Sequence, residues 1–142
     1  MKSLPIILIA LFLTACMQNE EITPTADVLV GSWISESVEI RSLSDEKSIS
    51  GYKNYLYFGE DHNFFRNYMG GEWELNGRYL TLKIYPDYSE IADWDYKIID
   101  FSKSSLTLQI QLTEGKYCCN FQEFESDEML LITEKYMLSH EE

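Results

Sequence analysis

The chain has 142 residues, of which 45% are hydrophobic, enough for one domain with a packed core. It carries 11 basic and 24 acidic residues, and Lys2 is the only charge before Cys16, so the rest has a formal net charge of 10 − 24 = −14. A field of this sign repels phosphate backbones and anionic lipid surfaces, which disfavours nucleic-acid partners and membrane docking through a basic patch. The plain interpretation of the acidity is a solvated surface.

The N-terminus has the pattern of an export signal. Lys2 supplies a short positive region, and the twelve residues "LPIILIALFLTA" that follow form an uninterrupted apolar stretch. A membrane-spanning helix needs about 20 apolar residues, so this stretch is too short to span a bilayer. We therefore expect residues 1–15 to be a signal peptide.

The segment Leu13-Thr14-Ala15-Cys16 resembles the lipobox of bacterial lipoproteins: a branched apolar residue, two small residues and a cysteine. The resemblance implies that Cys16 receives a diacylglyceryl thioether, that cleavage occurs before it, and that its new amino group is acylated, for example with palmitate. The alternative is an ordinary cleaved signal with an incidental cysteine. Several acyl chains on one residue anchor a domain without a transmembrane helix, so the predicted first partner is a membrane.

The residues after Cys16 bear on location and on the link to the domain. Met17, in place of aspartate, resembles the sorting rule of enteric bacteria for the outer membrane, and Glu20 and Glu21 faintly resemble the export tract of Bacteroidetes surface lipoproteins. We expect a lipid-anchored protein of the bacterial cell envelope, located in the outer membrane, with the choice between its periplasmic and surface faces left open. The polar, acidic composition of residues 16–27 predicts a flexible tether ahead of a domain over 28–138.

Strands dominate the expected domain, because apolar residues recur with a period of two. In "SLTLQIQL" (105–112) the leucines and Ile110 share one face, and "RYLTLKIY" (78–85) and "NYLYFG" (54–59) repeat the pattern. Further candidate strands are "NFFRNYM", "GEWEL", "DYKIIDF", "KYCCNFQEF" and "MLLITEKY". No segment shows a sustained helical stripe, so the sequence predicts an all-β fold.

Short turns connect these candidate strands. Asn76-Gly77 is the strongest two-residue signal for a hairpin turn, "GEDHN" (59–63) holds several turn formers, and "TEGK" (113–116) contains Gly115. Sequential hairpins with one apolar face predict an up-and-down antiparallel sheet that closes on itself. A barrel of about eight strands encloses either side chains or one small ligand.

Three motifs resemble lipocalin-like proteins, in order and spacing across residues 28–136. "LVGSWISES" resembles the Gly-x-Trp opening of lipocalins, read as Gly31-Ser32-Trp33, and "GGEWELNGRYLTLKI" and "FQEFESDEMLLIT" resemble blocks of the small lipocalin-like lipoproteins of Bacteroidetes. The resemblance implies that Trp33 and Trp73 are structural, with Trp33 closing one end of the barrel. No C-terminal helix fits after "MLLITEKYML". The interior is then either an open cavity or a core filled by Phe58, Phe64, Phe65 and Phe101.

Candidate chemistry is sparse. Cys118 and Cys119 are adjacent, so on a strand they point to opposite faces and resist pairing, and neither histidine, His62 or His140, has a metal-ligand spacing to them. We expect no metal site and no cofactor. No nucleophile elbow, catalytic triad or phosphate-binding glycine loop is present in the sequence, so we expect no enzyme.

The segment "YPDYSEIADWDY" (85–96) is the candidate binding loop, because it places aromatic residues beside four carboxylates. Aromatic rings with carboxylates suit sugar stacking or an oxygen-ligated cation such as Ca²⁺. The alternative is that the last two aromatic residues begin the next strand while the acids solvate the loop. The loop-binding candidates are Tyr85, Tyr88, Trp94 and Tyr96.

Two functions follow from these expectations. The first is a lipocalin-like binder of a small hydrophobic ligand inside the barrel. The second is a surface module that binds a protein or glycan through its loops and has a filled interior. An apolar cavity lined from several strands favours the first, and a filled barrel favours the second. The sequence leaves the oligomeric state open.

Overall fold

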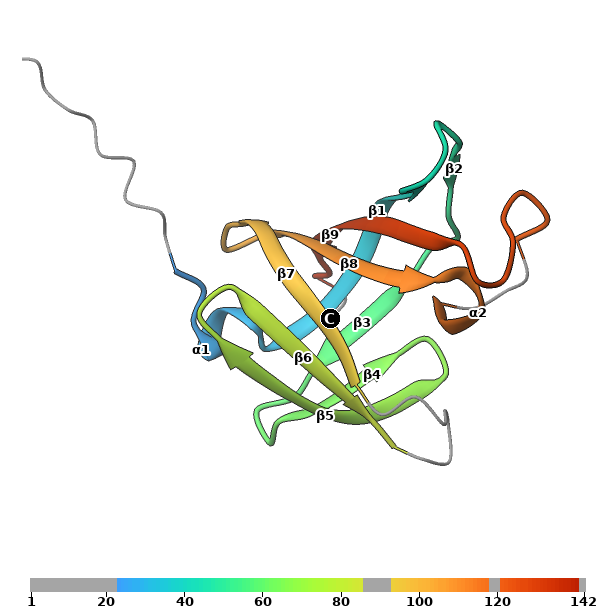
Figure 1. Ribbon diagram of the computed structural model, residues 1–142. Coiled ribbons are helices and arrows are strands. Elements are labelled where there is room, and N and C mark those ends of the chain that lie inside the picture. The colour runs from blue at the N-terminus through green and yellow to red at the C-terminus, as the bar shows by residue number, and fades with distance from the viewer. Residues whose placement is uncertain (1–22, 86–92, 118–120, 141–142) are drawn as a thin grey trace, which may run out of the picture.

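The computed structural model describes residues 23–85, 93–117 and 121–140 (Figure 1). The predicted lipidation segment (Leu13, Thr14, Ala15 and Cys16), Tyr88, Cys118 and Cys119 lie outside these residues. The strands are β1 (Gly31–Ser42), β2 (Ser48–Ser50), β3 (Tyr55–Phe58), β4 (Asn63–Arg66), β5 (Met69–Asn76), β6 (Tyr79–Ile84), β7 (Asp93–Phe101), β8 (Ser105–Thr113) and β9 (Met129–Leu138). Two short helices, α1 (Ala26–Leu29) and α2 (Glu114–Tyr117), complete the fold.

The strands form one antiparallel sheet that closes on itself. Strands β3 to β9 pair in chain order, and β1 pairs with β3 on one side and with β9 on the other, from Trp33↔Leu138 to Ser42↔Leu130. Strand β2 pairs only with the second half of β1, so it lies outside the ring. The result is an eight-stranded up-and-down barrel, which confirms the predicted all-β fold class.

The alternation seen in the sequence places the core inside the barrel. Leu56 and Phe58 of β3 point inward, as do Leu80, Leu82 and Ile84 of β6 and Leu106, Leu108 and Ile110 of β8. The expected interior phenylalanines divide: Phe58 and Phe64 are fully buried and Phe101 is half-buried. Phe65 was predicted inward but is 56% exposed, because it neighbours the inward Phe64 on the same strand.

The connection between β8 and β9 differs from the prediction. We predicted a tight turn at "TEGK" and a strand over 116–124, but the chain forms α2, residues 121–128 are not in a strand, and β9 begins at Met129. Hydrogen bonds within this connection hold it, from Phe121 N–H to the Glu114 carboxylate and from the Gly115 and Glu114 N–H groups to the carbonyls of Ser126 and Glu128. The backbone donors at its start are thus satisfied within the connection rather than by a neighbouring strand.

One end of the barrel is closed by α1. The Trp33 indole N–H donates a hydrogen bond of 2.9 Å to the Leu29 carbonyl, and both side chains are fully buried. Pro24 is buried as well, so the described end of the expected tether, residues 23–27, packs against the domain rather than extending from it. In Figure 1, α1 lies at the left end of the barrel and α2 at the right end.

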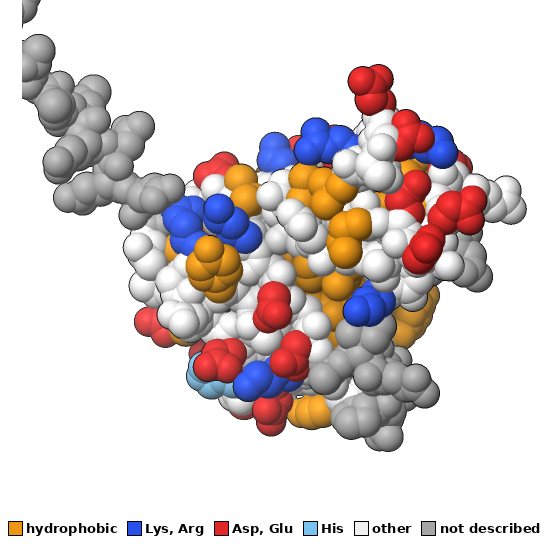
Figure 2. Space-filling view, viewed as in Figure 1, with side chains coloured by type: hydrophobic (Ala, Val, Ile, Leu, Met, Phe, Trp, Pro, Cys, Tyr) orange, Lys and Arg blue, Asp and Glu red, His pale blue; other side chains and the backbone are white. Residues whose placement is uncertain are grey.

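The surface shows how the acidic charge is distributed. On the face in Figure 2, Asp and Glu side chains occur in several separate places, with Lys and Arg side chains among them. Three ion pairs of this kind, Lys47–Asp45, Lys83–Glu74 and Lys135–Glu36, are at least half exposed on both sides. Within the described part of the chain, no helix has the length and apolar character needed to cross a membrane.

Candidate functional site

The candidate site is a cavity of about 650 Å³ at the end of the barrel opposite α1. Strands β3, β7 and β5 begin at this end and β4 ends there, so the cavity is lined from several strands and from the β8–β9 connection. Its lining residues are Tyr52, Lys53, Asn54, Tyr55, Arg66, Asn67, Tyr68, Met69, Trp94, Tyr117 and Phe121. We call this the open-end cavity. Its size lies in the range of about 300–1,000 Å³ that is typical of small-molecule sites.

A buried ion pair lies beneath the cavity. Arg66 of β4 donates from Nη2 to Glu134 Oε1 of β9 at 2.7 Å, and the two side chains are 4% and 0% exposed. The Glu134 carboxylate also accepts hydrogen bonds from the hydroxyls of Tyr96 (3.3 Å), Tyr117 (2.9 Å) and Tyr136 (2.6 Å). Arg66 in turn donates to the hydroxyl oxygens of Tyr117 and Tyr136, each at 3.2 Å. These five residues form the polar cluster of the barrel.

Strand alternation explains how two charges come to lie inside the barrel. Glu134 occupies an inward position of β9, two residues after Ile132 and two before Tyr136, and both of these neighbours are buried. Arg66 occupies the inward position two residues after Phe64 on β4. A buried charge needs a partner and hydrogen bonds, and each of the two supplies the charge that the other requires.

Sequence reasoning missed this cluster, although a signal was present. In "MLLITEKYML" the alternation assigns Glu134 to the same face as Leu130 and Ile132, so a carboxylate at that position calls for a cation from another strand. Which basic side chain pairs with Glu134 depends on how the strands close into the barrel. The sequence holds 11 basic residues and does not single out Arg66.

The interior keeps the tyrosine hydroxyls protonated. Burial raises the pKa of Tyr96, Tyr117 and Tyr136 well above the ordinary value, since a phenolate inside the barrel would lose its hydration. For Tyr117 the Glu134 carboxylate adds to this rise, while the positive charge of Arg66 opposes it. The three phenols therefore act as hydrogen-bond donors to Glu134 in the folded protein.

Aromatic rings surround the Arg66 guanidinium. Its Cζ lies 5.3 Å from the centre of the Trp94 ring and 5.7 Å from that of the Tyr117 ring, and these two rings are stacked with centres 5.8 Å apart. Cation–π attraction of this kind holds a guanidinium in a fixed orientation. The wall of the cavity is thus preorganised.

Three residues that line the cavity each have a buried N–H group without a hydrogen-bond partner among the described residues: Arg66 Nε, Trp94 Nε1 and Asn54 Nδ2. Most buried polar atoms in folded proteins are paired, so three unpaired donors around one cavity are a departure that calls for an explanation. The sequence could not indicate them, because pairing depends on the final packing.

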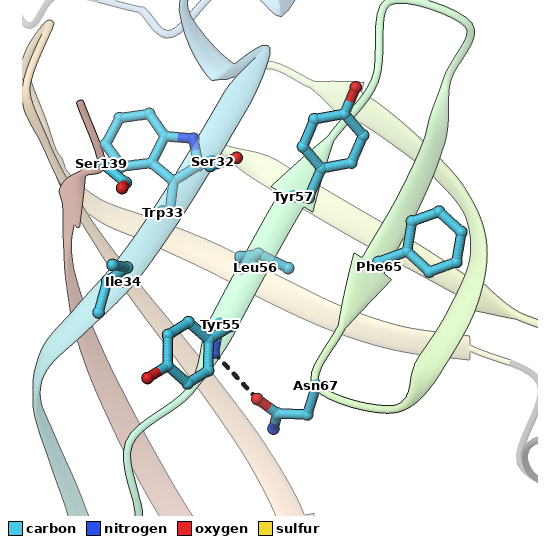
Figure 3. Close-up of a pocket in the computed structure, with 9 residues that line it drawn as sticks. All are labelled: Ser32, Trp33, Ile34, Tyr55, Leu56, Tyr57, Phe65, Asn67 and Ser139. Carbon is cyan, nitrogen blue, oxygen red and sulfur yellow. Dashed lines mark hydrogen bonds between the residues drawn. The ribbon is translucent and has the colours of Figure 1, made fainter. Parts of the chain in front are cut away.

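A second, smaller hollow of about 190 Å³ lies on the outer face of β1, β3 and β4 (Figure 3). Tyr57 and Phe65 are directly paired across β3 and β4, and with Tyr55 they are 44–56% exposed. The Asn67 side chain accepts the Tyr55 backbone N–H at 2.9 Å, as the dashed line in Figure 3 shows. This hollow presents exposed aromatic rings and contains none of the unpaired donors.

The residues of the predicted barrel motif lie in the closed half of the barrel. Gly31 adopts φ +136°, a conformation that favours glycine, and leads into β1 and Trp33. The Trp73 indole donates to the Gly59 carbonyl at 3.1 Å and packs edge-on against Phe58 at 5.4 Å. Both tryptophans are buried and make the packing contacts expected of structural residues.

The loop-binding candidates separate into different places. Strand β7 begins at Asp93, so Trp94 and Tyr96 are strand residues that point into the barrel, the alternative that the sequence left open. Trp94 lines the open-end cavity and Tyr96 belongs to the polar cluster. Tyr85 is 42% exposed and donates to Asn63 Oδ1 at 3.0 Å, outside the cavity lining. Of the three candidates that the structure describes, two therefore lie inside the barrel and one lies outside the cavity lining; Tyr88 is outside the described residues.

The described residues contain no group of three or more His, Cys, Asp or Glu side chains that could hold a metal ion. His62 stacks on Trp73 with ring centres 4.8 Å apart, in a turn with φ +64°. The Asp95 carboxylate accepts the Thr81 hydroxyl at 2.9 Å on the exposed side of β7. These groups thus have structural partners.

A comparison with known proteins found a similarity to one solved structure. No protein-family model matches the chain, and no curated protein matches it significantly. Among solved structures, the fold is similar to the crystal structure of a lipocalin-like protein from Bacteroides uniformis, with 14% identity, a TM-score of 0.43, and coverage of 79% of this chain and 99% of that one. The fold class rests on the closed sheet itself, the eight-stranded up-and-down barrel that lipocalins also have.

Proposed function

We propose that this protein binds a small, largely apolar ligand in the open-end cavity. One observation carries the proposal: a cavity of about 650 Å³ with a mainly aromatic lining, built over a rigid polar cluster. Binding pockets are mostly apolar with a few well-placed polar groups, which describes this cavity. The fully buried residues Trp33, Phe58 and Phe64 fill the barrel elsewhere, so the ligand occupies one end and not the whole interior.

Native mass spectrometry of the protein isolated from its own host tests this function. We expect a co-purified small molecule in the wild-type protein and its loss in Met69→Trp, which fills the cavity from a half-buried lining position. Met129→Trp is the matched control, because Met129 is 43% exposed and does not line the cavity. A ligand retained equally by both variants contradicts the proposal.

The proposed setting of this function is the bacterial cell envelope, with the protein anchored by lipid on Cys16. The apolar stretch and the lipobox-like segment Leu13-Thr14-Ala15 support this, and the negative charge argues against attachment through a basic patch. We expect Cys16→Ala to abolish palmitate labelling and to move the protein from the membrane to the soluble fraction. Membrane association that persists in this variant contradicts the anchor.

A second candidate function uses the outer hollow. Exposed Tyr55, Tyr57 and Phe65 around a shallow depression suit stacking of a sugar ring or an apolar side chain of a partner protein. We expect Tyr57→Ser to reduce retention on a glycan array if this surface is functional. Unchanged retention, or none in the wild-type protein, would remove the glycan version of this candidate.

A further inference from the structure

The residues that line the open-end cavity have unpaired hydrogen-bond donors. Arg66 Nε, Trp94 Nε1 and Asn54 Nδ2 are buried donors without partners within residues 23–85, 93–117 and 121–140. The orientation of the Asn54 amide is fixed: the Tyr55 backbone N–H donates to Asn67 Oδ1, so Asn67 Nδ2 faces Asn54 Oδ1 at 3.0 Å. The unpaired atom of Asn54 is therefore a donor and not an acceptor.

The acceptors near the floor are already engaged. Asn54 Oδ1 and Asn67 Oδ1 each accept a hydrogen bond, and the Tyr117 hydroxyl accepts from Arg66 while it donates to Glu134. The Glu134 carboxylate does not line the cavity and accepts from Arg66 and three tyrosines. Among the described residues that line the cavity, the unpaired buried side-chain atoms are thus all donors, whereas each of these acceptors already accepts at least one hydrogen bond.

We infer that the ligand carries an acceptor-only oxygen group, a carboxylate or ketone-type carbonyl, which the unpaired donors of Arg66, Trp94 and Asn54 bind. The apolar part of the ligand then lies among the aromatic rings nearer the mouth, where Tyr52 and Phe121 stack with centres 5.9 Å apart. This inference rests on the proposed ligand-binding function and names the chemistry that the site selects. Glu134 balances the charge of Arg66, so the donors suit a neutral carbonyl as well as a carboxylate.

The three tryptophans allow a direct test. The Trp33 and Trp73 indoles already donate to backbone carbonyls, whereas the Trp94 indole has no partner among the described residues. We would titrate the nitrogen-labelled full chain with 2-naphthoate, 2-acetylnaphthalene and 2-ethylnaphthalene, which share a shape and differ in the oxygen group, and follow the indole signals in a proton–nitrogen correlation spectrum. The first two probes should shift the Trp94 signal downfield and leave those of Trp33 and Trp73 in place.

Affinities give the second readout. We expect the carboxylate and the ketone to bind at least about tenfold more tightly than the hydrocarbon, because each satisfies buried donors that the hydrocarbon leaves unpaired. Trp94→Phe keeps an aromatic ring and removes one donor, so it should weaken the two oxygen-bearing probes about fivefold more than it weakens the hydrocarbon. Trp73→Phe is the matched control, since its indole does not line the cavity, and should change none of the three affinities.

The outcomes separate this inference from the function on which it rests. Equal affinities for the three probes, or a Trp94→Phe variant that binds the oxygen-bearing probes as the wild type does, overturn the acceptor-group inference and leave the ligand-binding function standing. Failure of all three probes to perturb any cavity residue at their solubility limits contradicts both. Which of the two oxygen-bearing probes binds more tightly then assigns the charge of the group.

Discussion

The two ends of the barrel use the same residue type in opposite ways. At the closed end, the Trp33 indole donates to Leu29 at 2.9 Å, and Trp73 likewise donates to Gly59 at 3.1 Å. At the open end, Trp94 is 3% exposed, but its indole N–H has no partner in the part of the chain that the structure describes. The closed end thus satisfies its polar groups internally, and the open end leaves donors in the wall of a cavity.

The two ends of the barrel also differ in their buried charges. The closed end joins α1 to apolar side chains, whereas the open end rests on Arg66 and Glu134 with three tyrosine hydroxyls. Burying an ion pair adds little net stability compared with an apolar core, but losing one partner leaves a costly unpaired charge. A polar cluster in this place therefore makes better sense as a rigid support for the cavity than as a source of stability.

The largest expected effect comes from breaking the ion pair. Glu134→Ala leaves the Arg66 guanidinium buried without its carboxylate, and we expect the free energy of unfolding to fall by about 3–5 kcal/mol. Glu36→Ala is the control, because it removes the carboxylate of an exposed pair with Lys135 and should cost about 0.5 kcal/mol or less. Urea denaturation followed by circular dichroism measures both, and similar losses in the two variants would contradict the role of the cluster.

The next effect is a loss of stability at high pH. Burial raises the pKa of Tyr96, Tyr117 and Tyr136, so above the ordinary phenol value of about 10 the unfolded chain releases protons that the folded barrel retains. The folded state then binds more protons than the unfolded state, and stability falls as the pH rises. Each tyrosine contributes at most about 1.4 kcal/mol per pH unit.

Urea unfolding at several values above pH ~9 measures this dependence. Tyr136→Phe removes one of the three hydroxyls and should make the fall with pH shallower, whatever it does to stability at neutral pH. A slope that this variant leaves unchanged would show that Tyr136 ionises equally in both states and would contradict its burial in the cluster.

The alternation of apolar and polar residues predicted most strands of the fold. Alternation in "RYLTLKIY" and "SLTLQIQL" and the turn at Asn76-Gly77 correctly indicated strands, inward faces and sequential hairpins, because these properties depend on near neighbours in the chain. The prediction of a strand over 116–124 was wrong for the residues that the structure describes, 116–117 and 121–124. Its aromatic residues Tyr117, Phe121 and Phe124 favoured one, but hydrogen bonds within the β8–β9 connection replace strand pairing there.

The candidate site was less predictable, because its parts meet only on closure of the barrel. Arg66 and Glu134 are 68 residues apart, and Tyr117 reaches them from α2. Trp94 was chosen from the sequence as a binding residue in a loop, but it lines the cavity from a strand. The inward position of Glu134 could be derived from alternation, whereas the partner of its charge and the unpaired donors depend on the packing.

The smallest expected effect compares two identical substitutions at the two ends. Trp33→Phe removes an indole that fills the closed end and leaves the Leu29 carbonyl buried without its donor, so we expect a loss of about 2 kcal/mol in the free energy of unfolding. Trp94→Phe removes an unpaired donor beside a cavity, and the relief of its desolvation offsets the lost packing, so we expect a change of about 0.5 kcal/mol or less. Urea denaturation without added ligand gives both values. Equal losses would mean that the Trp94 indole N–H already has a hydrogen-bond partner in the protein. The cavity would then lack the unpaired donor that favours an oxygen-bearing ligand.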